Sequence, residues 1–244
     1  IMQHTQCVVS YFYLNQKLIQ IYNMKLSKET LEALKNYASI NPNLVVRAGN
    51  RLTTLAEAKN IMAETEVQET FDTDFGIYDL NEFLSALSLI DDPTLDFGTN
   101  GVNISGSGAS VSYRFSNIEI LTSPTKEINM PTADISLTLD EITLGQLRRA
   151  AAALGHSTLS INVKDGKCVG TIFDPDNSSA NTYDLEIKGN FDNVTADVQF
   201  LMDNLKLLPG DYQISVSSKG LSQWTNINNQ TKYWIALEKS STFN

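Results

Sequence analysis

The chain has 244 residues, 42% of them apolar, with 18 lysines and arginines against 28 aspartates and glutamates. This composition excludes a mainly disordered chain, and the length suits one large domain or two of ordinary size. The net charge of −10 argues against a broadly basic nucleic-acid-binding protein, although phosphate contacts depend on local patches rather than on the sum.

The first 23 residues precede a candidate start at Met24. Their apolar runs are broken by Asn15, Gln16 and Lys17, so none approaches the roughly 20 residues needed to span a bilayer, and they lack the order of a signal peptide. We expect residues 1–23 to be an extension outside the folded domain, with an extra strand on a sheet edge as the alternative.

The next segment predicts a helix from Ser27 that ends before Pro42, with an apolar face at three- and four-residue spacing. Short alternating segments over residues 43–71 predict strands joined by hairpins. Asp79 is expected to cap a second helix that buries Phe83 and Leu87, and further strands follow Pro93. Residues 116–135 contain two prolines and little periodicity, which indicates a connector.

The second half repeats this order. Thr138 and Glu141 form an apparent capping box, and the helix behind them is expected to end at Gly155. Its predicted apolar stripe comprises Leu139, Ile142, Leu147, Ala150, Ala151 and Leu154. The pair Asp165-Gly166 predicts a hairpin, and residues 200–208 predict a short helix that stops at Pro209-Gly210.

Both halves therefore read helix, strands, short helix, strands, and Leu31 aligns with Leu147 as Leu87 does with Leu205. An internal duplication explains this order. We predict an α+β protein of two similar modules, residues 24–115 and 136–244, joined by the connector 116–135. Each module would contain two small antiparallel sheets and two helices.

Residues that carry catalysis are scarce. His4 lies in the extension and His156 follows a helix end, so no nucleophile with a histidine base is evident. The glycines Gly106 and Gly108 precede no helix and favour a hairpin over a phosphate loop. The turn at residues 174–179 lacks the glycine and glutamate of a calcium loop. We expect no enzymatic activity, no metal and no cofactor.

The basic residues are more informative, because they gather on the predicted helices while the strands and loops hold most of the acids. Ordinary solvated faces with some ion pairs are the simpler interpretation. The alternative is contact with DNA phosphates without base reading, since no base-reading motif is present. The candidate residues are Lys28, Lys35, Arg148, Arg149 and Lys206.

Several segments, in this order and at these distances, resemble the DNA polymerase sliding clamps of T-even-type bacteriophages. The resemblance covers the chain from Met24 onward, and it is carried by "MKLSKETLEALKNYASIN", "FGIYDLNEFLSALSLIDD", "STLSINVKDGK", "LLPGDYQISVSSKG" and "YWIALEKSSTF". The extension departs from the family pattern.

The resemblance implies the DNA-clamp fold and a homotrimer, whose six modules close a ring around duplex DNA with the helices lining the hole. It also implies that the five basic residues face DNA, with Lys25 as a further candidate, and that the helix at residues 80–90 contributes little charge. The implied partners are the replicative DNA polymerase, an ATP-driven clamp loader and late transcription factors, which dock through peptide tails into an apolar pocket on the second module. No membrane is implied, and the place of action would be the cytoplasm of the infected bacterial host.

The alternative function is a non-catalytic, duplicated β-rich scaffold or virion protein. Such a protein would share the acidity and the lack of catalytic groups. It would not need basic residues segregated to helices, and it would not slide off linear DNA.

Overall fold

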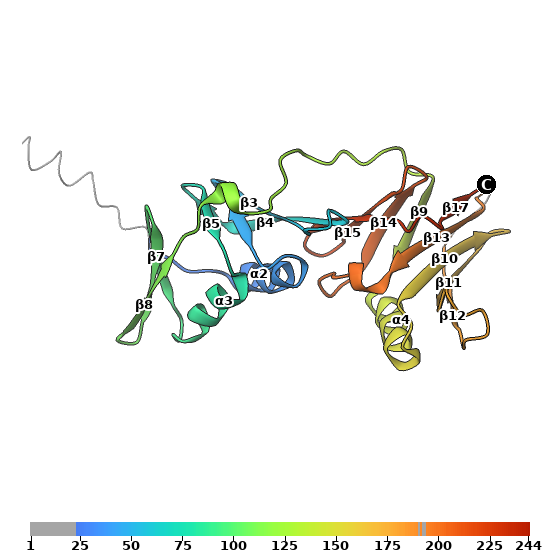
Figure 1. Ribbon diagram of the computed structural model, residues 1–244, viewed down its shortest axis with the longest axis horizontal. Coiled ribbons are helices and arrows are strands. Elements are labelled where there is room, and N and C mark those ends of the chain that lie inside the picture. Colours follow the sequence, from blue (N-terminus) through green and yellow to red (C-terminus); the bar gives the residue numbers. More distant parts are fainter. Residues whose placement is uncertain (1–22, 190, 192–193) are drawn as a thin grey trace, which may run out of the picture. The chain divides into compact units, whose positions relative to one another are not determined.

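The computed structural model describes residues 23–189, 191 and 194–244, which form two compact units (Figure 1). The described part of unit 1 comprises residues 23–26 and Glu82–Phe115, and unit 2 comprises Ser27–Asn81 and Ser116–Asn244. Apart from Asn23, the predicted extension lies outside the described residues. The units do not follow the two predicted modules, because one sheet of unit 2 joins strands from both halves, and the module boundaries stay a prediction.

Unit 1 is an antiparallel sheet in the order β1-β6-β7-β8. Its strands are β1 (Asn23–Met24), β6 (Thr94–Gly98), β7 (Gly101–Gly106) and β8 (Ala109–Arg114), and most of helix α3 (Leu80–Ser88) belongs to it. The ring of Phe83 meets that of Tyr113 edge-on at 5.1 Å. Ser107 and Gly108 both have positive φ, as a type I′ turn requires, so the predicted hairpin is confirmed.

Unit 2 begins with helix α2 (Lys28–Ile40), whose N-cap is Ser27. The Ser27 hydroxyl accepts a hydrogen bond from the Thr30 amide, which satisfies one free donor of the first turn. The chain continues through β2 (Leu44–Val46), β3 (Gly49–Leu55), β4 (Ile61–Phe71) and β5 (Phe75–Ile77), and β2 pairs with β5. The helix predicted between Ser27 and Pro42 is therefore confirmed.

A six-stranded antiparallel sheet in unit 2 joins the two halves of the sequence. Its order is β3-β4-β16-β15-β14-β9, with β9 (Ile135–Leu139), β14 (Tyr212–Ser217), β15 (Leu221–Asn226) and β16 (Lys232–Ala236). The junction is the pairing of β4 with β16, where Lys232 lies opposite Glu64 and Ile235 opposite Ile61. The Thr65 and Thr231 hydroxyls share a buried hydrogen bond of 2.9 Å beside it.

The second sheet of unit 2 has five strands in the order β12-β11-β10-β13-β17. They are β10 (Thr158–Lys164), β11 (Lys167–Phe173), β12 (Tyr183–Ile187), β13 (Ala196–Leu201) and β17 (Thr242–Phe243). Asp165 and Gly166 both have positive φ, so the predicted hairpin is confirmed. Helix α4 (Glu141–Leu154) packs on this sheet, where Gly170 leaves room for Leu147.

The predicted start of α4 is wrong by two residues. Thr138 and Leu139 belong to β9, and the N-cap is Asp140, whose carboxylate accepts from the Thr143 amide at 2.6 Å. The helix register that follows buries Leu144, Leu147 and Ala151, while Ile142, predicted in the apolar stripe, is 73% exposed. Strand β9 ends at Leu139, directly before the N-cap. Because no turn separates the strand from the helix, the sequence pattern does not mark where one ends and the other begins.

The predicted helix over residues 200–208 is also wrong. Phe200 and Leu201 end strand β13, where they pair with Leu159 and Thr158, and only a single 3₁₀ turn, η2 (Met202–Asn204), follows. Among its described residues, the second half therefore contains one α-helix rather than two. Pairing with β10 holds the start of the segment in the sheet, and Pro209 leaves too few residues for a helix after it.

A buried carboxylate stands at the start of α2. Glu69 is 8% exposed and accepts hydrogen bonds from the Ser27 amide and, at 2.5 Å, from the Thr30 hydroxyl. Burial by itself raises the pKa of Glu69, but these hydrogen bonds outweigh burial and the net pKa is lowered. The negative charge of the Glu69 carboxylate is also stabilised by the positive end of the dipole of α2.

We expect Glu69→Gln to lower the free energy of unfolding near neutral pH by on the order of 1 kcal/mol, because charge-assisted hydrogen bonds are removed. A lowered pKa stabilises the fold above the ordinary glutamate pKa, and this stabilisation is lost as the pH falls through the folded-state value. The difference between variant and wild type should therefore shrink below about pH 4.5. Denaturant titrations at several pH values measure it, and a difference independent of pH would contradict it.

Candidate nucleic-acid interface

Helix α2 presents two of the predicted cations to solvent. Ala33, Leu34 and Tyr37 bury the opposite face of the helix, and Lys28 and Lys35 are both exposed. The Lys28 ammonium lies 3.6 Å from the Glu32 carboxylate, in a pair whose side chains are 84% and 53% exposed. Exposed pairs of this kind are weak and are screened by salt, so the pair with Glu32 leaves the Lys28 ammonium accessible from solvent.

Helix α4 carries two adjacent arginines in different settings. Arg149 is exposed, whereas Arg148 is half-buried. The Nη2 of Arg148 donates to the Leu205 carbonyl oxygen at 2.8 Å and to the Leu207 carbonyl oxygen at 3.4 Å. Burial lowers the pKa of Arg148, but an arginine stays charged in proteins.

Lys206 lies in the irregular segment after η2 rather than on a helix. Its ammonium donates to the Ser39 carbonyl oxygen at 2.5 Å, near the C-terminus of α2. Its own carbonyl oxygen accepts a hydrogen bond from the side-chain amide nitrogen Nδ2 of Asn36 at 2.9 Å. In unit 1, Lys25 forms an ion pair with Asp92. Three of the five predicted residues therefore have exposed cationic ends, and the other two bind backbone carbonyls.

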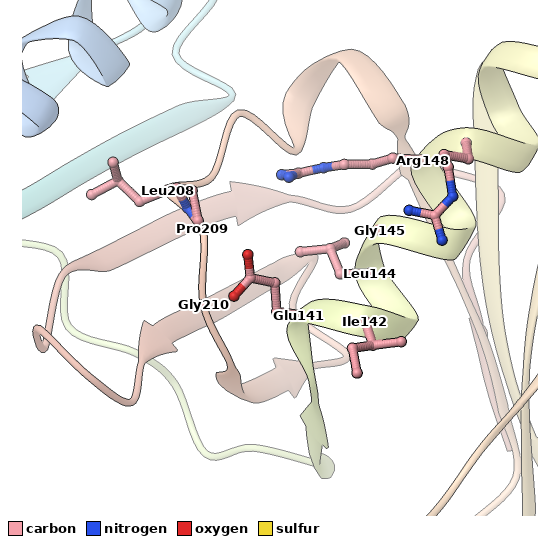
Figure 2. Close-up of a pocket in the computed structure, with 9 residues that line it drawn as sticks. Glu141, Ile142, Leu144, Gly145, Arg148, Leu208, Pro209 and Gly210 are labelled. Carbon is pink, nitrogen blue, oxygen red and sulfur yellow. The ribbon is translucent and has the colours of Figure 1, made fainter.

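A cavity of about 460 Å³ opens beside the two arginines (Figure 2). Leu208, Pro209 and Gly210 form one wall, and the first turns of α4 form the other. Figure 2 shows Arg148 extended from α4 toward the chain segment that leads to Leu208. Sequence reasoning missed this cavity, because it assigned Ile142 to the core and residues 200–208 to a helix.

The candidates for catalysis and metal binding are the histidine, cysteine and acidic side chains among the residues that the structure describes. The described residues contain no group of three or more such side chains that could hold a metal. Burial raises the pKa of the Cys168 thiol to about 12, so that thiol is no nucleophile at neutral pH. The ring Nε2 of His156 lies 2.8 Å from the Asn181 carbonyl oxygen. No helix within the described ranges is long and apolar enough to cross a membrane.

Two family models match the chain, one for DNA polymerase processivity factors over residues 27–110 and one for the C-terminal domain of the gp45 sliding clamp over residues 137–239. The sliding clamp of Vibrio phage KVP40 is 30% identical over 88% of this chain and 99% of its own length. The sliding clamp of Enterobacteria phage T4 is 32% identical over 90% of this chain and 99% of its own length.

Solved structures of low sequence identity share the fold. The PCNA of A. fulgidus, solved with the C-terminal region of FEN-1, has a TM-score of 0.67 at 9% identity, over 90% of this chain and 99% of that one. The DNA polymerase III beta sliding clamp of Bartonella birtlesii has a TM-score of 0.68 at 12% identity, over 91% of this chain and 66% of that one. The predicted clamp fold is thus confirmed, apart from the second helix of the second half.

Proposed function

The chain belongs to the sliding-clamp family of DNA polymerase processivity factors, and we propose that its copies close a ring that holds the polymerase on duplex DNA through the cations of α2 and α4. The observation that carries the proposal is the identity of 30–32% to phage sliding clamps over most of both chains. The exposed Lys28, Lys35 and Arg149 on helices of an otherwise acidic chain support it.

The proposed DNA contacts are with phosphates and are few. Lys28, Lys35 and Arg149 contact the backbone, while the cationic ends of Arg148 and Lys206 already bind carbonyl oxygens of the protein and neutralise no phosphate. Each phosphate that is neutralised releases counterions and adds salt-dependent affinity. A small number of such contacts gives a weak hold that lets the ring slide, and the acidic remainder repels DNA from other surfaces.

Ring closure is proposed to use β8 of one copy and β12 of the next, which are edge strands of their sheets. Each has a polar face, with Ser112 and Arg114 exposed on β8 and Asp184 and Glu186 exposed on β12, and alternate residues face inward. Pairing the two edges aligns polar with polar faces and places Arg114 among the carboxylates. Three copies of this two-module chain would complete six modules.

We expect Arg114→Glu to weaken the assembly at least tenfold, because a like charge would then face the carboxylates of β12. Glu186→Arg alone should weaken it less, since Asp184 remains, and the double variant should recover most of the loss. Sedimentation velocity across a concentration series gives the dissociation constants. Lys126→Glu, an exposed change in the connector, is the control. Equal losses in both single variants without recovery in the double variant would contradict this pairing.

The proposed partners are the replicative DNA polymerase, an ATP-driven clamp loader and late transcription factors, which dock through peptide tails on the second module. The protein would act in the cytoplasm of the infected bacterial host as a non-enzymatic factor. A duplicated scaffold or virion protein is the rival function, and neither the similarity to phage clamps nor the exposed cations on two helices favours it.

The decisive experiment loads the protein onto a primed circular DNA with a matching clamp loader and then linearises the circle. A clamp held by topology leaves the linear DNA and stays on the uncut circle. Retention on both at moderate salt would overturn the proposal, and so would the absence of loader-dependent retention on the circle.

A further inference from the structure

Residues Leu205–Leu208, which follow η2 and lead to Pro209, form an irregular segment that we call the strap. Leu205 and Leu207 are buried and belong to no helix or strand, so regular secondary structure does not supply partners for their carbonyl groups. Unpaired buried backbone groups are costly, and native chains find partners for them. The partners of the strap are side chains of α2, α4, β14 and β16, all in unit 2.

These side chains come from both halves of the sequence. From the second half, Arg148 binds the Leu205 and Leu207 carbonyls, the Tyr212 hydroxyl donates to the Leu208 carbonyl oxygen at 2.7 Å, and the Leu208 amide donates to the Tyr233 hydroxyl at 3.2 Å. From the first half, Asn36 binds the Lys206 carbonyl. The Tyr233 hydroxyl in turn donates to the Asn36 Oδ1 at 2.8 Å, which closes the network.

The strap is thus bound to two helices by cationic side chains, one from α4 and one of its own. Arg148 ties the strap to α4, and Lys206 ties it to the last turn of α2 through the Ser39 carbonyl oxygen. A cation at that position also complements the negative end of the helix dipole. The two helices that carry the exposed cations are therefore linked through the strap.

We propose that Arg148 and Lys206 are positioning residues, which hold α4 and α2 in place so that Lys28, Lys35 and Arg149 meet the DNA backbone together. This inference rests on the proposed function for its consequence at DNA, while the linkage itself rests on the hydrogen bonds above. Both hydrogen bonds come from the Nη2 of Arg148. This nitrogen lies one bond farther from the backbone than the ammonium nitrogen of a lysine, so a lysine at this position would fall short of the two carbonyl groups.

The test compares Arg148→Lys and Arg148→Gln with the same two changes at Arg149 in the full chain. Both Arg148 variants should lower the thermal midpoint, and both should speed amide hydrogen exchange in the last turn of α2 by roughly tenfold. Arg148→Gln should leave the slope of log affinity against log salt unchanged. Arg149→Gln should reduce that slope by roughly one for each phosphate that is no longer neutralised, and Arg149→Lys should preserve it.

Two outcomes would overturn the inference: normal exchange in α2 for Arg148→Lys, or a salt slope reduced by Arg148→Gln as much as by Arg149→Gln. An unchanged slope for Arg149→Gln would instead count against the proposed DNA contacts and leave the linkage intact. If the Arg148 variants do not fold, Asn36→Ala probes the strap from the other side, and it should speed exchange in the second half of α4. Unchanged exchange there would also overturn the inference.

Discussion

Replacing Gly101 by alanine should detach strand β8 from its sheet and, with it, one of the two proposed subunit contacts. A Cβ at this position would lie 2.3 Å from the Tyr113 carbonyl oxygen, which is backbone and belongs to the paired strand. Overpacking of this kind costs about 1–3 kcal/mol, and here relief requires the strand to move. We expect a lower denaturant midpoint and loss of assembly in sedimentation.

Gly98 provides the matched control, because it lies directly opposite Gly101 in the β6–β7 pair. A Cβ there would have its nearest contact at 3.5 Å, from the Gly101 carbonyl oxygen, which is ordinary van der Waals distance. Gly98→Ala should therefore leave both the midpoint and the assembly close to wild type. Equal effects of the two substitutions would show that the approach of Tyr113 is not what requires glycine.

Replacing Trp224 by alanine should cost about 3–5 kcal/mol of unfolding free energy, the range for large aromatic side chains in a core. Trp224 is fully buried and joins the two larger sheets of unit 2, since its ring meets Phe200 of the five-stranded sheet at 5.5 Å and Tyr212 of the six-stranded sheet at 6.2 Å. Chemical denaturation measures the loss, and a cost below about 1 kcal/mol would contradict this role.

A comparison with Trp234, the second tryptophan of the chain, separates the contribution of the hydrogen bond from that of the ring. The indole N–H of Trp224 donates to the Ser222 hydroxyl at 3.0 Å, while the buried N–H of Trp234 has no hydrogen-bond partner among the residues that the structure describes. Trp224→Phe should thus cost more than Trp234→Phe, although both remove the same atoms. The reverse order would show that packing rather than the hydrogen bond decides.

Much of the fold could be predicted from local patterns. The start of α2 at Ser27 and the Asp165-Gly166 turn each depend on a few neighbouring residues, and both form as expected. The segment 200–208 differs because its state is set by a distant strand: the pairing of Phe200 and Leu201 with β10 overrides a helical spacing of apolar residues. Thr138 likewise fits a capping box, but it pairs with Gln213 of β14 and therefore belongs to the sheet.

The candidate interface was predictable in part for a similar reason. Lys28 and Lys35 lie opposite the apolar face of α2, so periodicity alone indicates that they are exposed. Arg148 and Arg149 are adjacent, and which of them turns toward the strap depends on where the strap packs. The hydrogen bond from Lys206 to the Ser39 carbonyl of α2 could not be predicted from the sequence, because the segment around Lys206 was expected to be helical.

The sheet that joins both halves of the sequence has a consequence for the proposed ring, because it determines which strand pairings lie within one chain and which lie between copies. Within one chain, β4 and β16 continue a six-stranded ladder, and the strap reinforces that joint from the helix side. Between chains, only the short edges β8 and β12 are proposed to meet. In the proposed ring, opening would therefore separate two copies at their edge strands, because the pairing of β4 with β16 keeps both halves of each chain in one continuous sheet.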